Sequence, residues 1–129
     1  MTSVVTLQRI ESVVIAALVV CAFVALGYAW WWLPVLFLAF DLSAVGYLHG
    51  PRLGALLYNL GHSYTLPVLL AGIAIAVTTA GYRVVPLAVI AGAWVFHIAL
   101  DRALGYGLKN PTAFNDTHLG RIGKADRKP

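Results

Sequence analysis

The stretch Trp94–Lys109, WVFHIALDRALGYGLK, combines an apolar run with two ionisable side chains four positions apart, His97 and Asp101. In an α-helix this spacing places both side chains on one face, about one turn apart. Ionisable groups inside a membrane helix are costly and usually face a protein interior or a watery cavity. The stretch therefore predicts a polar site inside a membrane bundle, with the rest of the chain supplying its other walls.

The composition of the 129-residue chain is that of an integral membrane protein. Apolar residues make up 60% of it, charged residues only 11%, and the mean hydropathy is +0.82. A soluble domain is normally about half apolar and a quarter charged. The net charge of +4 comes from basic residues in loops and tails rather than from one patch, so we expect no nucleic-acid partner. No CxxC, GxGxxG, P-loop or GxSxG motif is present, which excludes the commonest nucleotide-binding and serine-hydrolase readings.

Four apolar segments are long enough to cross a bilayer, and they predict an all-α fold, a four-helix integral membrane bundle forming a single domain. We place the spans at about residues 6–29, 33–48, 55–80 and 87–104, followed by a polar tail over residues 109–129.

Two features refine this bundle. Pro67 falls inside the third span and is expected to kink it and to free a carbonyl one turn back. Most Lys and Arg residues, among them Arg9 and Arg52, lie on the side of the chain termini, whereas Arg83 lies on the other side. The positive-inside rule therefore places both termini in the cytoplasm. The expected location is a cell membrane, specifically a bacterial inner membrane.

Ionisable side chains from all four predicted helices fall at one depth. Counted at about 1.5 Å per residue from the terminal-side helix ends, they lie roughly 6–12 Å into the membrane. The residues concerned are Glu11, Asp41, His62, His97 and Asp101. Several bare carboxylates at one level would repel each other, and a bound cation removes that repulsion. Helical bundles often build metal sites in this way from facing helices.

We therefore predict a divalent metal ion bound by Asp41, His62, His97 and Asp101. Carboxylate oxygens and neutral imidazoles suit zinc, iron or manganese, and zinc or iron is the expected ion.

Three other interpretations stay open from the sequence. Arg9 or Arg102 could pair with the acids in a metal-free network of salt bridges. His62 and His97 could be the two axial ligands of a haem. The acids and histidines could also form the proton relay of a small proton-coupled carrier.

Three blocks of sequence resemble a known family. The blocks are Asp41-Leu-Ser with Gly46-Tyr47 and Gly50-Pro51-Arg52-Leu53-Gly54-Ala55; Tyr58-Asn59-Leu60-Gly61-His62-Ser63-Tyr64 with Pro67; and His97-Ile98-Ala99-Leu100-Asp101-Arg102 through Gly105-Tyr106-Gly107-Leu108-Lys109, with Phe114 and Thr117-His118-Leu119-Gly120. With Arg9-Ile10-Glu11 they resemble a family of small bacterial four-helix membrane proteins catalogued as a domain of unknown function. The resemblance covers nearly the whole chain and implies an integral membrane fold, but no activity. The His97/Asp101 pair is also similar to that of membrane-bound metal-dependent hydrolases with His and Asp on transmembrane helices.

The leading hypothesis is a membrane-embedded, metal-dependent hydrolase acting on a membrane lipid or another amphiphile from the cytoplasmic leaflet. Glu11 is the candidate general base for a metal-bound water. Asn59 would orient a ligand or polarise a carbonyl. Basic residues near the interface would meet an anionic headgroup. The predicted substrate-binding residues are Arg102, Lys109, His118, Tyr58 and Tyr106.

A second hypothesis is a non-catalytic membrane protein whose polar cluster fixes helix packing or a partner surface. Gly46, Gly50 and Gly54 recur every four residues, and such small-residue spacing allows close backbone approach and can mediate dimers. A homo-oligomer is therefore one expected form.

The tail between Thr112 and Leu119 has too few apolar residues for a membrane helix and too many for a purely solvated segment. Phe114 and Leu119 are the expected anchors on the bundle. We predict that this segment lies across the cytoplasmic mouth as a lid and brings His118, and with it Asp116, close to the site. From Gly123 onward the basic residues are expected to be disordered or to lie against anionic headgroups.

Overall fold

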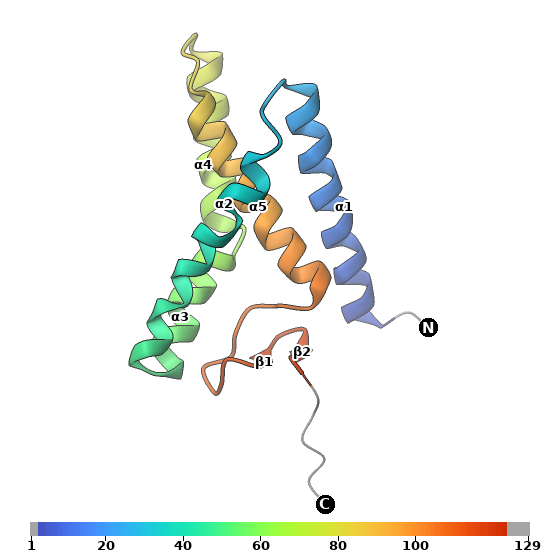
Figure 1. The fold of residues 1–129 in the computed structure, drawn as a ribbon, viewed down its shortest axis with the longest axis vertical. Helices are drawn as coiled ribbons and strands as arrows, with labels where there is room; N and C mark the ends of the chain where they lie inside the picture. Colours follow the sequence, from blue (N-terminus) through green and yellow to red (C-terminus); the bar gives the residue numbers. More distant parts are fainter. Residues whose placement is uncertain (1–2, 124–129) are drawn as a thin grey trace, which may run out of the picture.

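The computed structural model describes residues 3–123, so the basic residues from Lys124 onward, with the prediction made for them, lie outside the described range. Figure 1 shows the order of the elements along the chain. They are α1 (Val4–Ala25), α2 (Trp32–Phe40), the 3₁₀-helix η1 (Asp41–His49), α3 (Pro51–His62), α4 (Thr65–Thr79), α5 (Val85–Leu104), β1 (Asp116–Thr117) and β2 (Gly120–Arg121).

Four helical stretches are long and apolar enough to cross a membrane, as predicted. They are Val4–Ala25, Trp32–His49, Pro51–Thr79 and Val85–Leu104. The fold is all-α across these spans, and the protein is a multi-pass membrane protein. The start of α1 and the end of α5 lie at the same end of the molecule (Figure 1). That this end faces the cytoplasm of a bacterium stays a prediction.

The second and third spans are not the uniform α-helices that the apolar runs predicted. The second is an α-helix only to Phe40 and continues as nine residues of 3₁₀-helix. Runs of 3₁₀-helix longer than three or four residues are uncommon, and they often mark a functional hinge or strain.

The third span is broken rather than kinked. Helix α3 ends at His62, Ser63 is extended with φ −93° and ψ 148°, and α4 begins at Thr65. The break falls one turn before Pro67, which has no N–H to donate to the carbonyl of Ser63. The proline thus frees that carbonyl, as expected, and the helix also stops there.

Helix α5 is the element around which the others are arranged. Helices α1, α2 and α4 all pack against it, whereas η1 packs mainly on α3 (Figure 1). A buried cluster of Phe23, Leu33, Val89 and Ala93 joins α1, α2 and α5. The short tail strands lie below the end of α5, at the same end of the molecule as the turn between η1 and α3 (Figure 1).

Glycine spacing serves the hairpin of η1 and α3. A methyl group on Gly54 would collide with the ring of Tyr47, and one on Gly46 would meet the carbonyl oxygen of Leu53 at 2.9 Å. Gly50 makes the turn between the two helices with φ +114°, a conformation that other residues rarely adopt. Gly46 and Gly54, which the sequence also offered as dimer contacts, are therefore occupied by packing within the chain.

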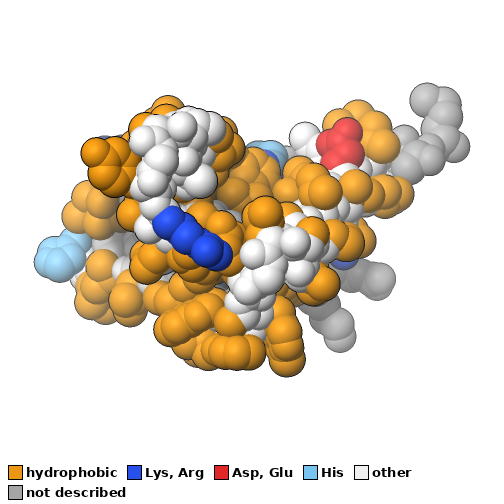
Figure 2. Space-filling view, turned by 90° about the horizontal axis from the view of Figure 1, so that it is seen from above, with side chains coloured by type: hydrophobic (Ala, Val, Ile, Leu, Met, Phe, Trp, Pro, Cys, Tyr) orange, Lys and Arg blue, Asp and Glu red, His pale blue; other side chains and the backbone are white. Residues whose placement is uncertain are grey.

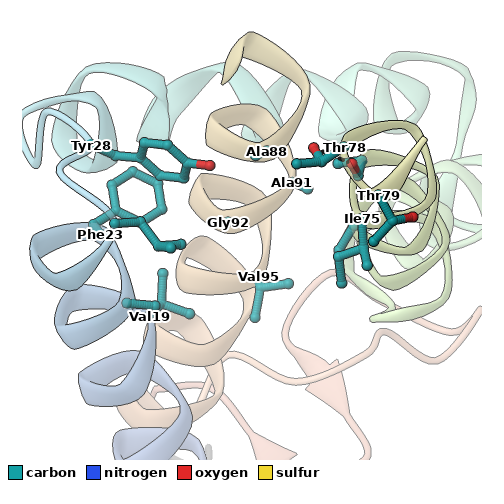
Figure 3. Close-up of a pocket in the computed structure, with 14 residues that line it drawn as sticks. Val19, Phe23, Tyr28, Ile75, Thr78, Thr79, Ala88, Ala91, Gly92 and Val95 are labelled. Carbon is teal, nitrogen blue, oxygen red and sulfur yellow. Dashed lines mark hydrogen bonds between the residues drawn. The ribbon is translucent and has the colours of Figure 1, made fainter. Parts of the chain in front are cut away.

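The half of the molecule that lies away from the tail is apolar. A pocket of ≈ 370 Å³ lies between α1 and α4 over the surface of α5. Figure 3 shows Phe23 and Tyr28 on one wall, Ile75 on the other and Gly92 between them. Seen from this end, the surface is mostly hydrophobic (Figure 2).

Candidate metal centre

Four side chains converge on one point at the level where the hairpin of η1 and α3 meets α5. They are Asp41, His62, His97 and Asp101, and one potential ligand atom from each lies within 4.8 Å of the others. These are the four residues that the sequence selected as metal ligands. No other group of three or more such side chains occurs among the residues that the structure describes.

The four separations between histidine nitrogens and aspartate oxygens match the edges of a coordination shell. His62 Nε2 lies 3.5 Å from Asp41 Oδ1 and 3.4 Å from Asp101 Oδ2. His97 Nε2 lies 3.6 Å and 3.7 Å from the same two oxygens. A tetrahedral ion with bonds of about 2.0–2.1 Å has ligand atoms about 3.3–3.4 Å apart. The four His-to-Asp distances are therefore those that a bound ion requires, to within a few tenths of an ångström.

The hydrogen bonds of His62 fix which of its nitrogens is free. Its Nδ1 lies 3.0 Å from the backbone oxygen of Tyr58 and 3.2 Å from Ser43 Oγ. A carbonyl oxygen only accepts, and the Ser43 hydroxyl already donates to the carbonyl of Phe40. Nδ1 must therefore carry the proton. Nε2 then presents its lone pair to the centre, as a metal-ligating imidazole does.

His97 is enclosed by aromatic rings. It is fully buried, and its ring centroid lies 4.4 Å from that of Phe37 and 5.6 Å from that of Phe40. Nδ1 makes no well-formed hydrogen bond within residues 3–123, although the backbone carbonyl of Phe37 faces this ring. The aromatic walls fix the direction of Nε2 and keep water from that side of the centre.

The two carboxylates differ in their access to solvent. The Asp101 side chain is 13% exposed and accepts a hydrogen bond of 3.3 Å from the hydroxyl of Tyr58. The Asp41 side chain is 44% exposed. The Tyr58 ring also stacks on His62, with centroids 3.7 Å apart and planes at 8°. The centre is thus closed by Tyr58 and the aromatic residues and open beside Asp41.

Local backbone structure places the four ligands in two different ways. His97 and Asp101 stand one turn apart on the regular helix α5, as their spacing predicted. Asp41 begins η1, and His62 is the last residue of α3. The helical breaks in the second and third spans therefore occur at the two remaining ligands.

Two alternative interpretations from the sequence do not fit this arrangement. The ion pairs within the described residues all join a histidine and an aspartate, so the salt-bridge network with arginine is wrong there. Arg9 instead donates to the carbonyl of Ala103, and Arg102 to that of His62. Bis-histidine haem ligation is also wrong, because His62 Nε2 and His97 Nε2 are only 2.9 Å apart and leave no room for a porphyrin between them.

Asn59 holds the tail rather than facing the centre. Its side-chain amide donates to the carbonyl of Lys109 at 2.9 Å, and its oxygen accepts from the N–H of the same residue at 2.7 Å. Both ends of the amide are therefore engaged, which leaves neither for the predicted contact with a substrate.

Lys109 is buried, contrary to its predicted place at the lipid interface. The residue is 3% exposed, and its ammonium lies 4.1 Å from the ring of Phe114 and 4.8 Å from that of Tyr58. Tyr106 completes this aromatic cage at 5.9 Å. Cation–π attraction offsets part of the desolvation of the charge. Burial nevertheless lowers the pKa of Lys109, and the negative charge of Asp101 opposes that shift only in part.

The tail packs on the bundle through its two predicted anchors. Phe114 contacts Tyr47 and Tyr58 at centroid distances of 5.1 and 6.3 Å, and Leu119 is buried. Tyr58 belongs to the wall of the centre, so the tail covers the site from this side. The segment thus has the position expected of a lid.

His118 and Asp116 are not brought to the centre as predicted. His118 Nδ1 accepts a hydrogen bond from the N–H of Leu108, and burial and the nearby Arg102 charge lower the pKa of this imidazole. Asp116 accepts from Thr112 and Asn110 within its own turn, and these bonds hold the pKa of its carboxyl below the usual range. Both side chains stabilise the fold of the tail.

Glu11 also lies outside the group of four ligands. It is exposed on α1 and lines a separate small pocket with Arg102 and His118. The structure therefore does not bring this predicted base to the centre. The depth count placed Glu11 at the right level, but α1 reaches the bundle on another side of α5.

Three residues that shape the centre were missed from the sequence. The Ser43 hydroxyl accepts a hydrogen bond from His62. Its side chain fits there because Gly61 has no side chain, and a Cβ atom at Gly61 would collide with Ser43. Trp94 donates to the carbonyl of Gly61 at 2.6 Å and stacks on Phe40. Ser43 and Gly61 lie in the blocks that carry the family resemblance, and that was the one signal available for them.

The family resemblance is confirmed by comparison with known families. The model of the family described as Domain of unknown function (DUF4260) matches residues 5–122, and the chain belongs to this family. No curated protein and no solved structure gave a significant match. The match thus covers the four spans and the tail hairpin but assigns no activity to the centre.

Proposed function

We propose that this member of the DUF4260 family is a membrane-embedded metalloprotein that binds one divalent transition-metal ion, zinc or iron, through Asp41, His62, His97 and Asp101. The observation that supports this most is the convergence of two imidazole Nε2 atoms and two carboxylate oxygens within 4.8 Å, with His–His and His–Asp separations of 2.9–3.7 Å.

Electrostatics supports a cation at this point. His62 directs an unprotonated nitrogen at the centre, and the carboxylates add negative charge in surroundings that are mostly apolar. Electron-rich atoms repel each other at such distances unless a positive charge lies between them. A divalent ion supplies that charge, and the two-nitrogen, two-oxygen ligand set suits zinc or iron.

Metal content tests the proposal directly. Protein purified in detergent, and reconstituted with zinc or iron(II), should hold about one ion per chain, and His97→Ala should hold less than about a tenth of that. His49→Ala is the matched control, because His49 is exposed at the hairpin turn. Wild-type protein without metal after reconstitution, or equal losses in the two variants, would contradict the proposal.

A second candidate function is supported by one distance. The two Nε2 atoms are 2.9 Å apart, which is a hydrogen-bond length and shorter than an ideal tetrahedral edge. A proton shared between the rings would also supply positive charge, as in a proton relay. In that case the protein should stay metal-free, and His62→Ala should lower thermal stability equally with and without a chelator.

The reaction that we propose for the metal form is hydrolysis of a lipid or another amphiphile. The partly exposed Asp41 supports it, because it leaves one side of the centre accessible. A bound ion would supply Lewis-acid chemistry there. The test is release of fatty acid or headgroup from lipids in nanodiscs, with His97→Ala as the inactive control. Equal rates for the two proteins would contradict hydrolysis while leaving metal binding to its own test.

A further inference from the structure

A second polar pocket lies between α1 and α5 at the tail end of the bundle. It has a volume of ≈ 160 Å³, which is small for a ligand site and suits a headgroup rather than a whole lipid. Four elements form its walls: Glu11 and Ser12 from α1, Tyr64 from the break before α4, Arg102 from α5 and His118 from the tail.

Three hydrogen-bond donors in this pocket are available to a ligand. Tyr64 Oη and Arg102 Nε are buried and make no hydrogen bond to any residue in the range 3–123. His118 accepts at Nδ1 from the N–H of Leu108, so its neutral ring carries its proton on Nε2. Buried polar groups without partners are costly, and a ligand with several acceptor oxygens would satisfy them together.

The pocket also carries opposite charges that do not contact each other. Arg102 and Glu11 both line it, yet they form no ion pair, since the ion pairs among the described residues join only histidines and aspartates. Arg102 instead lies 4.4 Å from the centroid of the Tyr64 ring, which fixes the guanidinium at one side. A ligand with a negative and a positive group would bridge the two sides.

The position of the pocket selects the kind of ligand. It lies between the third turn of α1 and the last turn of α5, toward the tail end of two membrane-spanning helices, so a headgroup can reach it from the membrane surface. Arg9 and Arg121 line a neighbouring pocket beside Leu119, so the surroundings are basic. Such surroundings favour phosphate groups of lipids.

We propose that this pocket binds a phosphate ester that carries an ammonium group, as in the headgroup of a zwitterionic phospholipid. Tyr64, Arg102 and His118 donate to the phosphate oxygens, and Glu11 faces the ammonium group. The site needs no metal and is independent of the proposed metal centre. Free phosphoethanolamine has the same chemistry, so the experiment must distinguish it from the lipid.

The test is the affinity of the full-length protein in detergent for phosphatidylethanolamine, for phosphatidylglycerol with the same acyl chains, and for phosphoethanolamine alone. Tyr64→Phe removes only the unpartnered hydroxyl and keeps the ring beneath Arg102. It should weaken binding of both lipids roughly tenfold, the value of one hydrogen bond to a charged group. Tyr82→Phe is the matched control, because Tyr82 is 71% exposed outside this pocket.

Glu11→Gln separates the two halves of the headgroup. It should weaken the binding of phosphatidylethanolamine severalfold and leave the affinity for phosphatidylglycerol within about twofold of wild type, because only the first lipid carries an ammonium group. Equal affinities for the Tyr64→Phe and Tyr82→Phe proteins, or equal weakening of both lipids by Glu11→Gln, would overturn the proposal. Phosphoethanolamine binding as tightly as the lipid would overturn the lipid as the ligand. Unchanged metal content and melting temperature in Tyr64→Phe would show that the variant is folded.

Discussion

The two halves of the candidate metal centre are built differently. Helix α5 contributes His97 and Asp101 from regular backbone in the most buried of the four spans. The hairpin of η1 and α3 contributes Asp41 and His62 from points where regular α-helix stops. The first pair is fixed by one helix and its packing. The second pair depends on close hairpin packing at Gly54 and on the tail that covers it.

The largest expected difference between the halves concerns the carboxylates. Asp101→Asn should weaken metal binding roughly a hundredfold or more, because the residue is mostly buried and water cannot easily replace the lost charge. Asp41→Asn should cost roughly tenfold, because this side chain is 44% exposed and water can take its place. Competition with a metal-binding dye measures both. A larger loss for Asp41→Asn would reverse the comparison.

Hairpin packing gives the next largest effect. Gly54→Ala places a methyl group against the Tyr47 ring and should destabilise the fold by about 1–3 kcal/mol, the usual cost of overpacking. Gly72→Ala on α4 meets no atom within 4 Å and should be neutral or stabilise by up to about 1 kcal/mol. Unfolding by denaturant in mixed micelles measures both. Equal stabilities would mean that the hairpin relaxes without cost.

Loss of one side chain should release the tail, with an effect confined to that segment. Asn59→Ala removes two hydrogen bonds to the backbone of Lys109 and should cost about 1–3 kcal/mol locally. Trypsin should then cleave after Lys109 at least tenfold faster. Metal binding should also weaken, because the released tail lies on the His62 side of the centre and not on the α5 side. Asn115→Ala is the control, because Asn115 lies in the same tail and its bond to the N–H of Ile122 uses only its backbone oxygen. Equal cleavage rates in wild type and Asn59→Ala would mean that the clamp does not hold the tail.

The smallest effect is a pH dependence from Lys109. Burial lowers the pKa of its ammonium below the ordinary 10.5, so the unfolded chain binds more protons between the two pKa values. Stability should therefore rise with pH through that window, as the folded protein no longer buries a charge. Melting temperatures at pH 7 and 9.5 should show a smaller rise for Lys109→Met than for wild type. An identical rise would mean that the aromatic cage fully compensates the burial.

The sequence by itself determined the membrane class, the four spans and the four ligands of the candidate centre. Apolar run length is a local property, and the spacing of His97 and Asp101 converts directly into one helical face. Asp41 and His62 were predicted by counting residues from the helix ends, because each residue of a membrane-spanning helix lies at a depth fixed by its distance from the helix end. The proline at position 67 likewise indicated an irregular third span.

Only the tertiary structure decided which polar residues at that depth meet. Glu11 lies at the predicted depth but on another side of α5. The direction in which a helix faces around a bundle is set by packing and not by distance along the sequence. The nine residues of 3₁₀-helix in the second span lie against α3, where Gly54 and Gly61 leave room for the side chains of Tyr47 and Ser43. Lys109 reads as an interfacial cation, yet Tyr58 from α3 encloses it together with two nearby rings, Tyr106 and Phe114. Such contacts depend on how separate elements pack, and no local pattern encodes them.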